Sequence, residues 1–389
     1  MNIVIGVFGG LLLAMTSLSS WAAVTCSIKP GWPRTDTFQL SPPTISAGAD
    51  IPNGTVIYQG RWVSGEADTG QFECLSPIAD EAFWFNIALT LNSTPLPLST
   101  WSGSPFGGAV YQTNIPGVGV AISRSNTADA AALGSPNYQF PQDYQRTLEN
   151  GGYSARLLSR TLYISLIKIG PISPGSYTLN ASSLPTAAIT AVSGNSHPAT
   201  AGLPIRLFNI ELQGQLTISS QTCTTPDVAV ELGTYEKRLY FKGINSTTPW
   251  IDSSISLTNC PTFHGFYNQD NSTLLFDYTT GTGSVANSTN NSIGVRLTPT
   301  TSVIDAANGI MAIDSTVAGA ATGVGIQIGW GDRSQTPTVF NFASEQAMTL
   351  PKDGSPTIRV PLAARYIQTA TDPTPGKANG KLIFTINYY

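Results

Sequence analysis

The sequence predicts an all-β protein built from two β-sandwich or barrel domains. Gly and Pro are abundant, at 37 and 27 of 389 residues, and they separate many short runs rich in Val, Ile, Thr and aromatic residues. Several of these runs alternate polar and apolar residues, as half-buried strands do, and none keeps a helical period over three turns. Hydrophobic residues make up 41% of the chain, which is enough for buried cores and argues against a disordered Gly- and Pro-rich chain.

The first element along the chain is an export signal. Residues 3–15 are all apolar or Gly, and residues 17–23 are small or polar apart from Leu18 and Trp21. This arrangement is typical of a signal peptide, and the apolar run is shorter than the ~20 residues of a membrane span. We expect residues 1–22 to be the signal peptide, with cleavage after residue 22 or 23. Because no Lys or Arg precedes the apolar run, a retained anchor is the alternative.

Charged residues are scarce, at 11% of the chain, and the net charge is −4. No basic cluster is present that would attract nucleic acid or an anionic membrane, so neither is an expected partner. The polar surface must instead come from Ser, Thr, Asn and Gln. Such a surface suits an extracellular protein that docks on neutral, hydroxyl-rich partners.

The chain has four cysteines: Cys26, Cys74, Cys223 and Cys260. An even number in an exported chain predicts disulfide bonds. Three pairings are possible, and sequence separation favours joining the first two and the last two. A metal site would need Cys-x-x-Cys or clustered His, whereas the two histidines, His197 and His264, lie far apart. We expect no metal and no other cofactor.

The two cysteine pairs imply two domains. We expect the first at residues 23–212 and the second at residues 213–389, with the boundary just before the strand-like residues 216–219. Four of the six tryptophans after the signal peptide fall in the first domain: Trp32, Trp62, Trp84 and Trp101.

Alternating runs follow one another through the second domain. The expected strands are residues 227–232, 251–257, 274–278, 324–328, 357–368 and 381–389. Because side chains alternate between the faces of a strand, the last run puts four apolar side chains on one face. These are Leu382, Phe384, Ile386 and Tyr388.

The second domain resembles the pilin domains of the chaperone–usher pathway. The resemblance is carried by Cys-Thr-Thr-Pro at residues 223–226 with Val228, Val230, Leu232 and Gly233, by the alternating residues 323–328, and by residues 360–369. A further match is the family's chaperone-recognition pattern, a Gly fourteenth from the carboxyl end and a penultimate aromatic. Gly376 and Tyr388 stand at these two positions.

The resemblance implies an immunoglobulin-like sandwich that has six strands and lacks the seventh. An apolar groove then stays open until another protein donates a strand to it, which is β-augmentation. The implied partners are a periplasmic chaperone, an outer-membrane usher and the next pilus subunit, with the carboxylate of Tyr389 anchored on basic residues of the chaperone. The residues that border the implied groove are Gly376, Leu382, Phe384, Ile386, Tyr388 and Tyr389.

The position of Cys26 favours a tip subunit. A shaft pilin carries a donor strand of its own before its first Cys, whereas here Cys26 closely follows the expected cleavage site and a whole additional domain comes next. Within the family this arrangement resembles a two-domain tip adhesin, exported through the periplasm and exposed at the tip of the fimbria on the cell surface. A structural cap or minor pilus subunit without a receptor is the alternative.

The first domain resembles the receptor-binding domains of two-domain fimbrial adhesins in residues 51–56, Ile-Pro-Asn-Gly-Thr-Val, followed by Cys74. These are immunoglobulin-like or jelly-roll sandwiches that mostly bind sugars and sometimes matrix proteins. A sugar site needs an aromatic platform and a few amide or carboxylate groups. The candidate ligand-binding residues are Trp32, Trp101, Asn137, Tyr138, Gln142, Asp143 and Tyr144. We expect Trp62, Trp84 and Phe85, which lie in strand-like runs, to be in the core.

Catalysis is not expected, and no catalytic residue is assigned. The chain has two histidines and no nucleophile-elbow motif, and no Gly-rich loop opens a helix as a phosphate-binding loop does. Because a glycosidase needs two carboxylates at a spacing that sequence does not show, a secreted carbohydrate-acting enzyme is a remote alternative.

Overall fold

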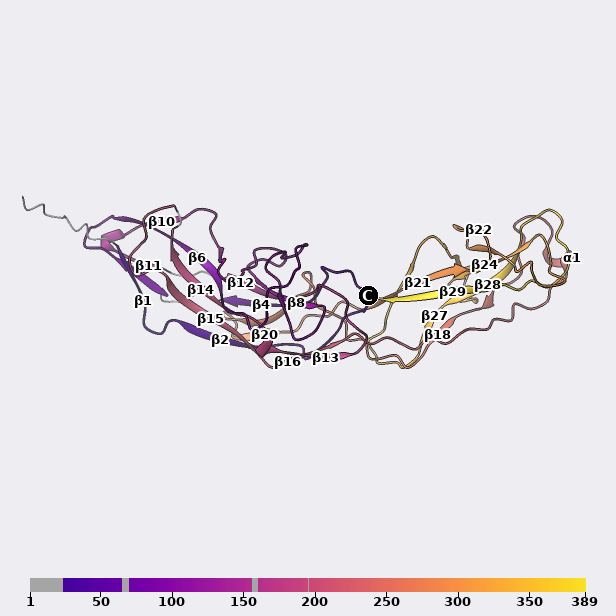
Figure 1. Cartoon of the computed structure of the whole chain (residues 1–389), viewed down its shortest axis with the longest axis horizontal. Coiled ribbons are helices and arrows are strands. Elements are labelled where there is room, and N and C mark those ends of the chain that lie inside the picture. Colours follow the sequence, from indigo (N-terminus) through magenta and orange to yellow (C-terminus); the bar gives the residue numbers. More distant parts are fainter. Residues whose placement is uncertain (1–23, 65–69, 156–159, 195) are drawn as a thin grey trace, which may run out of the picture.

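The computed structural model describes residues 24–64, 70–155, 160–194 and 196–389. Within these ranges the chain forms two elongated parts, both built from strands, that follow each other along one axis (Figure 1). The helical elements of the described residues are α1 (Lys237–Tyr240) and the 3-10 turns η1 (Glu149–Gly151) and η2 (Ala181–Ser183). The all-β prediction is confirmed.

The predicted signal peptide, residues 1–22, lies outside the described residues. Among the residues that are described, no helix has the length and apolar character that crossing a membrane requires.

The first part begins with sixteen strands. They are β1 (Thr25–Ile28), β2 (Arg34–Gln39), β3 (Thr44–Ser46), β4 (Val56–Ser64), β5 (Phe72–Leu75), β6 (Ala82–Ser93), β7 (Tyr111–Gln112), β8 (Val118–Ser123), β9 (Asn137–Tyr138), β10 (Tyr144–Thr147), β11 (Gly152–Ala155), β12 (Arg160–Lys168), β13 (Ser176–Asn180), β14 (Thr186–Ser193), β15 (Ile205–Gln213) and β16 (Gln215–Ser219).

Two large sheets enclose the core of the first part. One has the order β10-β6-β14-β15-β2, with β9 also paired to β6, and the other contains β4-β12-β8-β7. Alternation along β6 turns four buried side chains toward this core: Phe83, Phe85, Ile87 and Leu89. Trp62 is buried there as predicted, whereas Trp84, on the opposite face of β6, is not part of the core. The prediction for Trp84 was wrong because its place in an alternating strand sets it on the outer face.

The remaining strands follow β16 along the chain, and most of them belong to the second part. They are β17 (Ile251–Asp252), β18 (Ile255–Leu257), β19 (Thr273–Asp277), β20 (Thr282–Ser284), β21 (Ser292–Pro299), β22 (Val303–Asp305), β23 (Ile310–Ala312), β24 (Val324–Trp330), β25 (Thr338–Val339), β26 (Gln346–Thr349), β27 (Ile358–Val360), β28 (Leu362–Gln368) and β29 (Leu382–Tyr388).

A separate core lies between the sheets of the second part. These sheets are β17-β28-β24-β23-β22 and β26-β21-β29, with the short pair β18-β27 beside them. The predicted strands at residues 324–328 and 381–389 correspond to β24 and β29, and the predicted strand at 357–368 is interrupted at Pro361. Residues 227–232 were also expected to form a strand, but they pair with no strand among the described residues.

The two cysteine pairs are joined as the sequence spacing favoured. Cys26 bonds to Cys74 in the first part and Cys223 to Cys260 in the second. The first bond joins β1 to β5, where the two cysteines are direct cross-strand partners.

The change from one part to the other differs from the expected boundary in two ways. The boundary between residues 212 and 213 falls inside β15, and β16 still pairs with β13 and β3 of the first part. In addition β19, which follows Cys260, pairs in parallel with β4, and β20 extends that sheet to the order β20-β19-β4-β12-β8-β7. The chain therefore returns to the first part after it has begun the second.

Candidate functional site

A groove of about 1140 Å³ lies in the second part. Leu382 and Phe384 of β29 line one side of it, and apolar side chains of β24 and β28 form its floor. The floor residues are Val324, Ile326, Ile328, Leu362 and Ala364. They all come from alternating runs whose inward faces meet across the core, so the groove is continuous with that core.

One edge of β29 is unpaired along this groove. On its other edge β29 pairs with β21, and Tyr389 exchanges two backbone hydrogen bonds with Ser292 (2.8 and 3.0 Å). Because backbone groups alternate in direction along a strand, those of Leu382, Phe384 and Ile386 face the opposite edge. No strand of the described residues pairs there. An unpaired edge beside an apolar groove is suited to accept an extended segment from another chain.

Residues 227–235 form the opposite wall of the groove. They belong to no helix or strand, and Val228 and Val230 are partly exposed. Leu232 packs against the core of the second part, which holds this wall in place. The wall ends at Tyr235, whose ring meets that of Tyr366 on β28 edge-on, with 6.2 Å between ring centroids. Burial raises the pKa of the Tyr366 phenol, and Tyr235 and Glu231 add to the rise.

Gly376 lines the groove, and at this residue the chain passes very close to a neighbouring loop. A Cβ atom at this residue would lie 2.5 Å from the backbone nitrogen of Ala321 and 2.6 Å from the carbonyl oxygen of Gly319. Backbone hydrogen bonds of Lys377 with the same two residues keep this loop in place (both 2.9 Å). Position 376 therefore has no room for a side chain.

The six residues expected along the groove divide into two groups. Gly376, Leu382 and Phe384 line it, and Ile386 packs against the core beside it. Tyr388 is buried in the core of the second part, and Tyr389 lies at the junction of the two parts, where the carboxyl end of the chain is found (Figure 1). The Tyr388 hydroxyl accepts a hydrogen bond from the backbone N–H of Cys223 (3.1 Å), and burial raises its pKa.

Trp32 and Trp101, two candidate ligand-binding residues, pack within the fold. The Trp32 ring meets Phe208 edge-on, with 5.0 Å between ring centroids, and lies against the core. Trp101 donates its indole N–H to the carbonyl of Pro105 (2.9 Å), and its ring lies close to Gly54 and Gly103. Both rings are half-buried and serve packing.

The candidate residues between 137 and 144 do not form one pocket. Asn137 accepts a hydrogen bond from Arg124 (2.6 Å), and the carbonyl of Tyr138 accepts another from the same guanidinium. The Asp143 side chain is 3% exposed, and its carboxylate binds His197 (3.0 Å) and the backbone N–H of Ser196 (2.8 Å). A carboxylate held in this way supports the local loop. Gln142 is exposed.

Tyr144 belongs to a cationic and aromatic group that sequence reasoning missed. Its ring stacks on Phe140 (4.8 Å between centroids), and the guanidinium of Arg146 lies 4.0 Å from the centre of the Tyr144 ring. Arg146 also hydrogen-bonds the hydroxyl of Tyr153 (3.3 Å). β10 and β11 lie toward the end of the first part that is farther from the second (Figure 1). The alternation of Tyr144 and Arg146 along one strand was the available signal.

A second group on the same sheet was also missed. Trp84 stacks on His197 with 4.3 Å between ring centroids and an angle of 3° between the rings. Gln145 is the cross-strand partner of Trp84 on β10, so the two side chains share the outer face of the sheet.

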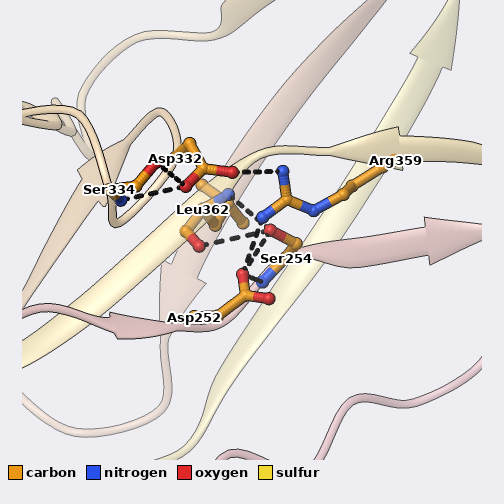
Figure 2. A network of polar contacts seen from close by, with 6 residues as sticks. All are labelled: Asp252, Ser254, Asp332, Ser334, Arg359 and Leu362. Carbon is orange, nitrogen blue, oxygen red and sulfur yellow. Dashed lines mark hydrogen bonds and ion pairs between the residues drawn. The ribbon is translucent and has the colours of Figure 1, made fainter.

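A polar network on the second part is fully paired and serves the fold. Figure 2 shows Arg359 between two carboxylates, at 2.9 Å from Asp332 and 3.0 Å from Asp252. The N–H and hydroxyl of Ser334 lower the pKa of Asp332 to about 2, and Arg359 adds to the effect. Ser254 donates to Asp252 (2.6 Å) and receives the N–H of Leu362. Among the described residues, no cluster of three or more His, Cys, Asp or Glu could hold a metal ion.

Known proteins are similar to all or part of this chain. Residues 210–389 match the family model described as Fimbrial protein. A fimbria adhesin protein of Klebsiella pneumoniae is 24% identical over 385 residues, and the alignment covers 97% of each chain.

Two solved structures are similar to parts or most of the chain. The CupB6 tip adhesin of Pseudomonas aeruginosa is 17% identical with a TM-score of 0.33, and 94% of each chain is covered. The receptor-binding domain of the adhesin MrkD1P of Klebsiella pneumoniae is 20% identical with a TM-score of 0.32. That match covers 52% of this chain and 98% of the other.

Proposed function

We propose that this chain is a fimbrial tip adhesin of the chaperone–usher type, and that a strand donated by another protein fills the groove beside β29 and holds the adhesin in the fimbria. The observation that carries the proposal is the unpaired edge of Leu382, Phe384 and Ile386 above an apolar floor. A strand placed there would gain a hydrogen-bonded partner and cover apolar surface at the same time.

The energy available to such a strand is large. Burying about 400 Å² of apolar surface would stabilise the complex by about 10 kcal/mol, before the cost of ordering the strand. We propose that a periplasmic chaperone fills the groove first and the next pilus subunit replaces it after delivery to an outer-membrane usher. The adhesin would then be exposed at the tip of the fimbria, outside the cell.

Peptide binding to the full chain tests the groove. The probe is a synthetic twelve-residue peptide of alternating Val and Thr with terminal Lys. We expect it to raise the melting temperature of the wild type. The variant Phe384→Asn should lose most of this rise because Phe384 lines the groove. The matched control is Ile383→Asn, whose side chain is 56% exposed on the other face of β29 and should keep the effect. Equal responses of the two variants would argue against the groove.

We further propose that the first part binds a host or surface glycan through the group around Tyr144, Arg146 and Gln142. The support is chemical: the partly buried Tyr144, the guanidinium of Arg146 that lies over its ring and the exposed amide of Gln142 offer hydrogen-bonding groups of the kind that fix sugar hydroxyls. The proposed role is attachment, with no chemical reaction.

A glycan array, with collagen and fibronectin spots added, tests the receptor proposal on the full chain. Replacing Arg146 by Ala should weaken binding about tenfold or more, as loss of a central arginine commonly does. The control is Arg206→Ala, an exposed arginine on β15, which should bind as the wild type does. A wild type that binds nothing on the array would favour a structural cap.

A further inference from the structure

The first part of the molecule reaches the free edge of β29 at one residue, Tyr388. The backbone N–H of Asp50 donates to the carbonyl of Tyr388 (3.0 Å), and the N–H of Tyr388 donates to the Asp50 carboxylate (2.9 Å). Asp50 lies in the loop between β3 and β4, more than 300 positions away in the sequence.

These two bonds lie on the groove side of β29. Tyr389 is bonded to Ser292 of β21, so the backbone groups of Tyr388 face the other way, as those of Ile386 and Phe384 do. Asp50 therefore occupies the position that the next residue of an incoming strand would take after passing Ile386.

The loop that carries Asp50 is fixed from inside the first part. Lys168, at the end of β12, is 5% exposed, and its ammonium donates to the carbonyls of Ala49 (2.7 Å) and Ile51 (2.6 Å). These carbonyls flank Asp50 on both sides. Burial lowers the pKa of Lys168, and the nearby Asp50 carboxylate opposes this shift.

Close backbone contact fixes the other end of the loop. A Cβ atom at Gly48 would lie 2.2 Å from the carbonyl oxygen of Tyr388, so the loop approaches β29 at a distance that excludes a side chain. The Asn291 amide bridges the two parts beside it, because it donates to the carbonyls of Ser46 (3.0 Å) and Tyr389 (3.3 Å).

We propose that residues 48–51 block further pairing of the donated strand and so form a stop. The donated strand then pairs only with Leu382, Phe384 and Ile386, and its end lies against the first part of the molecule. The inference rests on the proposed function of the groove and adds a regulation of the same site. The occupant is an extended segment of another fimbrial subunit with alternating apolar side chains. Any change at Asp50 or Lys168 then alters how far that segment pairs.

Amide hydrogen exchange resolved to single residues tests the stop on the full chain. The probe is the alternating Val and Thr peptide. In the wild type without peptide, the Tyr388 amide should exchange at least about tenfold more slowly than in Asp50→Ala, because its bond goes to a charged acceptor. Adding peptide to the wild type should slow Phe384 and Ile386 and leave Tyr388 unchanged.

In Asp50→Ala the same peptide should also slow Tyr388, because the strand now pairs one position further. Lys168→Met should likewise let the peptide slow exchange of the Tyr388 amide. Asp50→Asn keeps an acceptor oxygen, so the slowing in this variant should be intermediate between that in the wild type and that in Asp50→Ala. Asp270→Ala, an exposed aspartate, is the control and should match the wild type. Near-ultraviolet circular dichroism identifies any variant that has not folded, and Asp50→Asn then carries the comparison.

Two results would overturn the stop. One is a wild-type Tyr388 amide that exchanges as fast as Phe384 without peptide. The other is a Tyr388 amide that the peptide protects equally in the wild type and in Asp50→Ala. If the peptide protects the Phe384 amide in none of the proteins, both the groove proposal and the stop are refuted. If it protects Phe384 but Tyr388 responds as in either result above, only the stop is refuted.

Discussion

Asp36 is a buried carboxylate that receives its partner from the other part of the molecule. The hydroxyl of Tyr278 donates to one of its oxygens (2.6 Å), and a guanidinium nitrogen of Arg34 lies 3.8 Å away. Its second oxygen is buried and has no hydrogen-bond partner among the described residues. Burial raises the pKa of Asp36, and Arg34 opposes the rise. The folded protein therefore holds the proton of this carboxyl more tightly than the unfolded chain does.

This shift predicts a pH dependence of stability. Because the folded state binds the proton more tightly than the unfolded state, the contribution of Asp36 falls as pH rises from about 3.8 through the raised pKa. Asp36→Asn should lack this fall, since its amide can still accept from Tyr278. Urea unfolding between pH 3.5 and 7 should show the variant gaining stability over the wild type as pH rises. Asp270→Asn, an exposed control, should show no such gain, and parallel curves for Asp36→Asn would contradict the prediction.

At the scale of elements, β19 shows how a correctly predicted strand acquires an unexpected partner. Alternation at residues 274–278 predicted a strand, and β19 (Thr273–Asp277) is there. Its partner is β4 of the first part, with which it runs in parallel. Gly60 of β4 leaves room for Leu275, and Phe276 packs beside Phe38. Nothing in the local pattern encodes this pairing, because any exposed strand edge with a matching apolar face would satisfy it.

β29 shows the opposite case, an element whose sequence indicated an absent partner. Its alternation and the positions of Gly376 and Tyr388 predicted a groove edge, and the unpaired edge is found at Leu382, Phe384 and Ile386. Tyr388 shares the alternation, but its backbone is bonded by Asp50. The difference arises from a loop that is distant in sequence, so the strand pattern could not contain it.

At the scale of the whole molecule, the two parts are interlocked in both directions. The second part gives β19 and Tyr278 to the first, and the first gives the loop of Asp50 to β29. Tyr267, Leu275 and Phe276 belong to the first part's core or pack against it. Since these contacts replace water on apolar surfaces that the first part would otherwise expose, the parts should stabilise each other.

Replacement of residues 273–284 in the full chain by a Gly/Ser linker of equal length tests this interlock. The change removes β19 and β20 and should lower the melting temperature of the first part by roughly 10 °C, since several half-buried apolar side chains are lost. Tryptophan fluorescence reports the transition because Trp62 lies next to Tyr278. Val285→Ser, whose side chain is 50% exposed, is the control and should melt as the wild type does. An unchanged transition would show that the first part is complete without β19.

The sequence by itself determined the all-β class, the two disulfide pairs and the alternating edge of β29. These properties are local: they follow from the two-residue period of strands, from turn residues and from short loop closure. Only the tertiary structure decided that β19 completes the sheet of the first part, that Asp143 supports a loop and that Arg146 lies over Tyr144. Those outcomes depend on contacts between distant segments, which are selected by the packing of the whole chain.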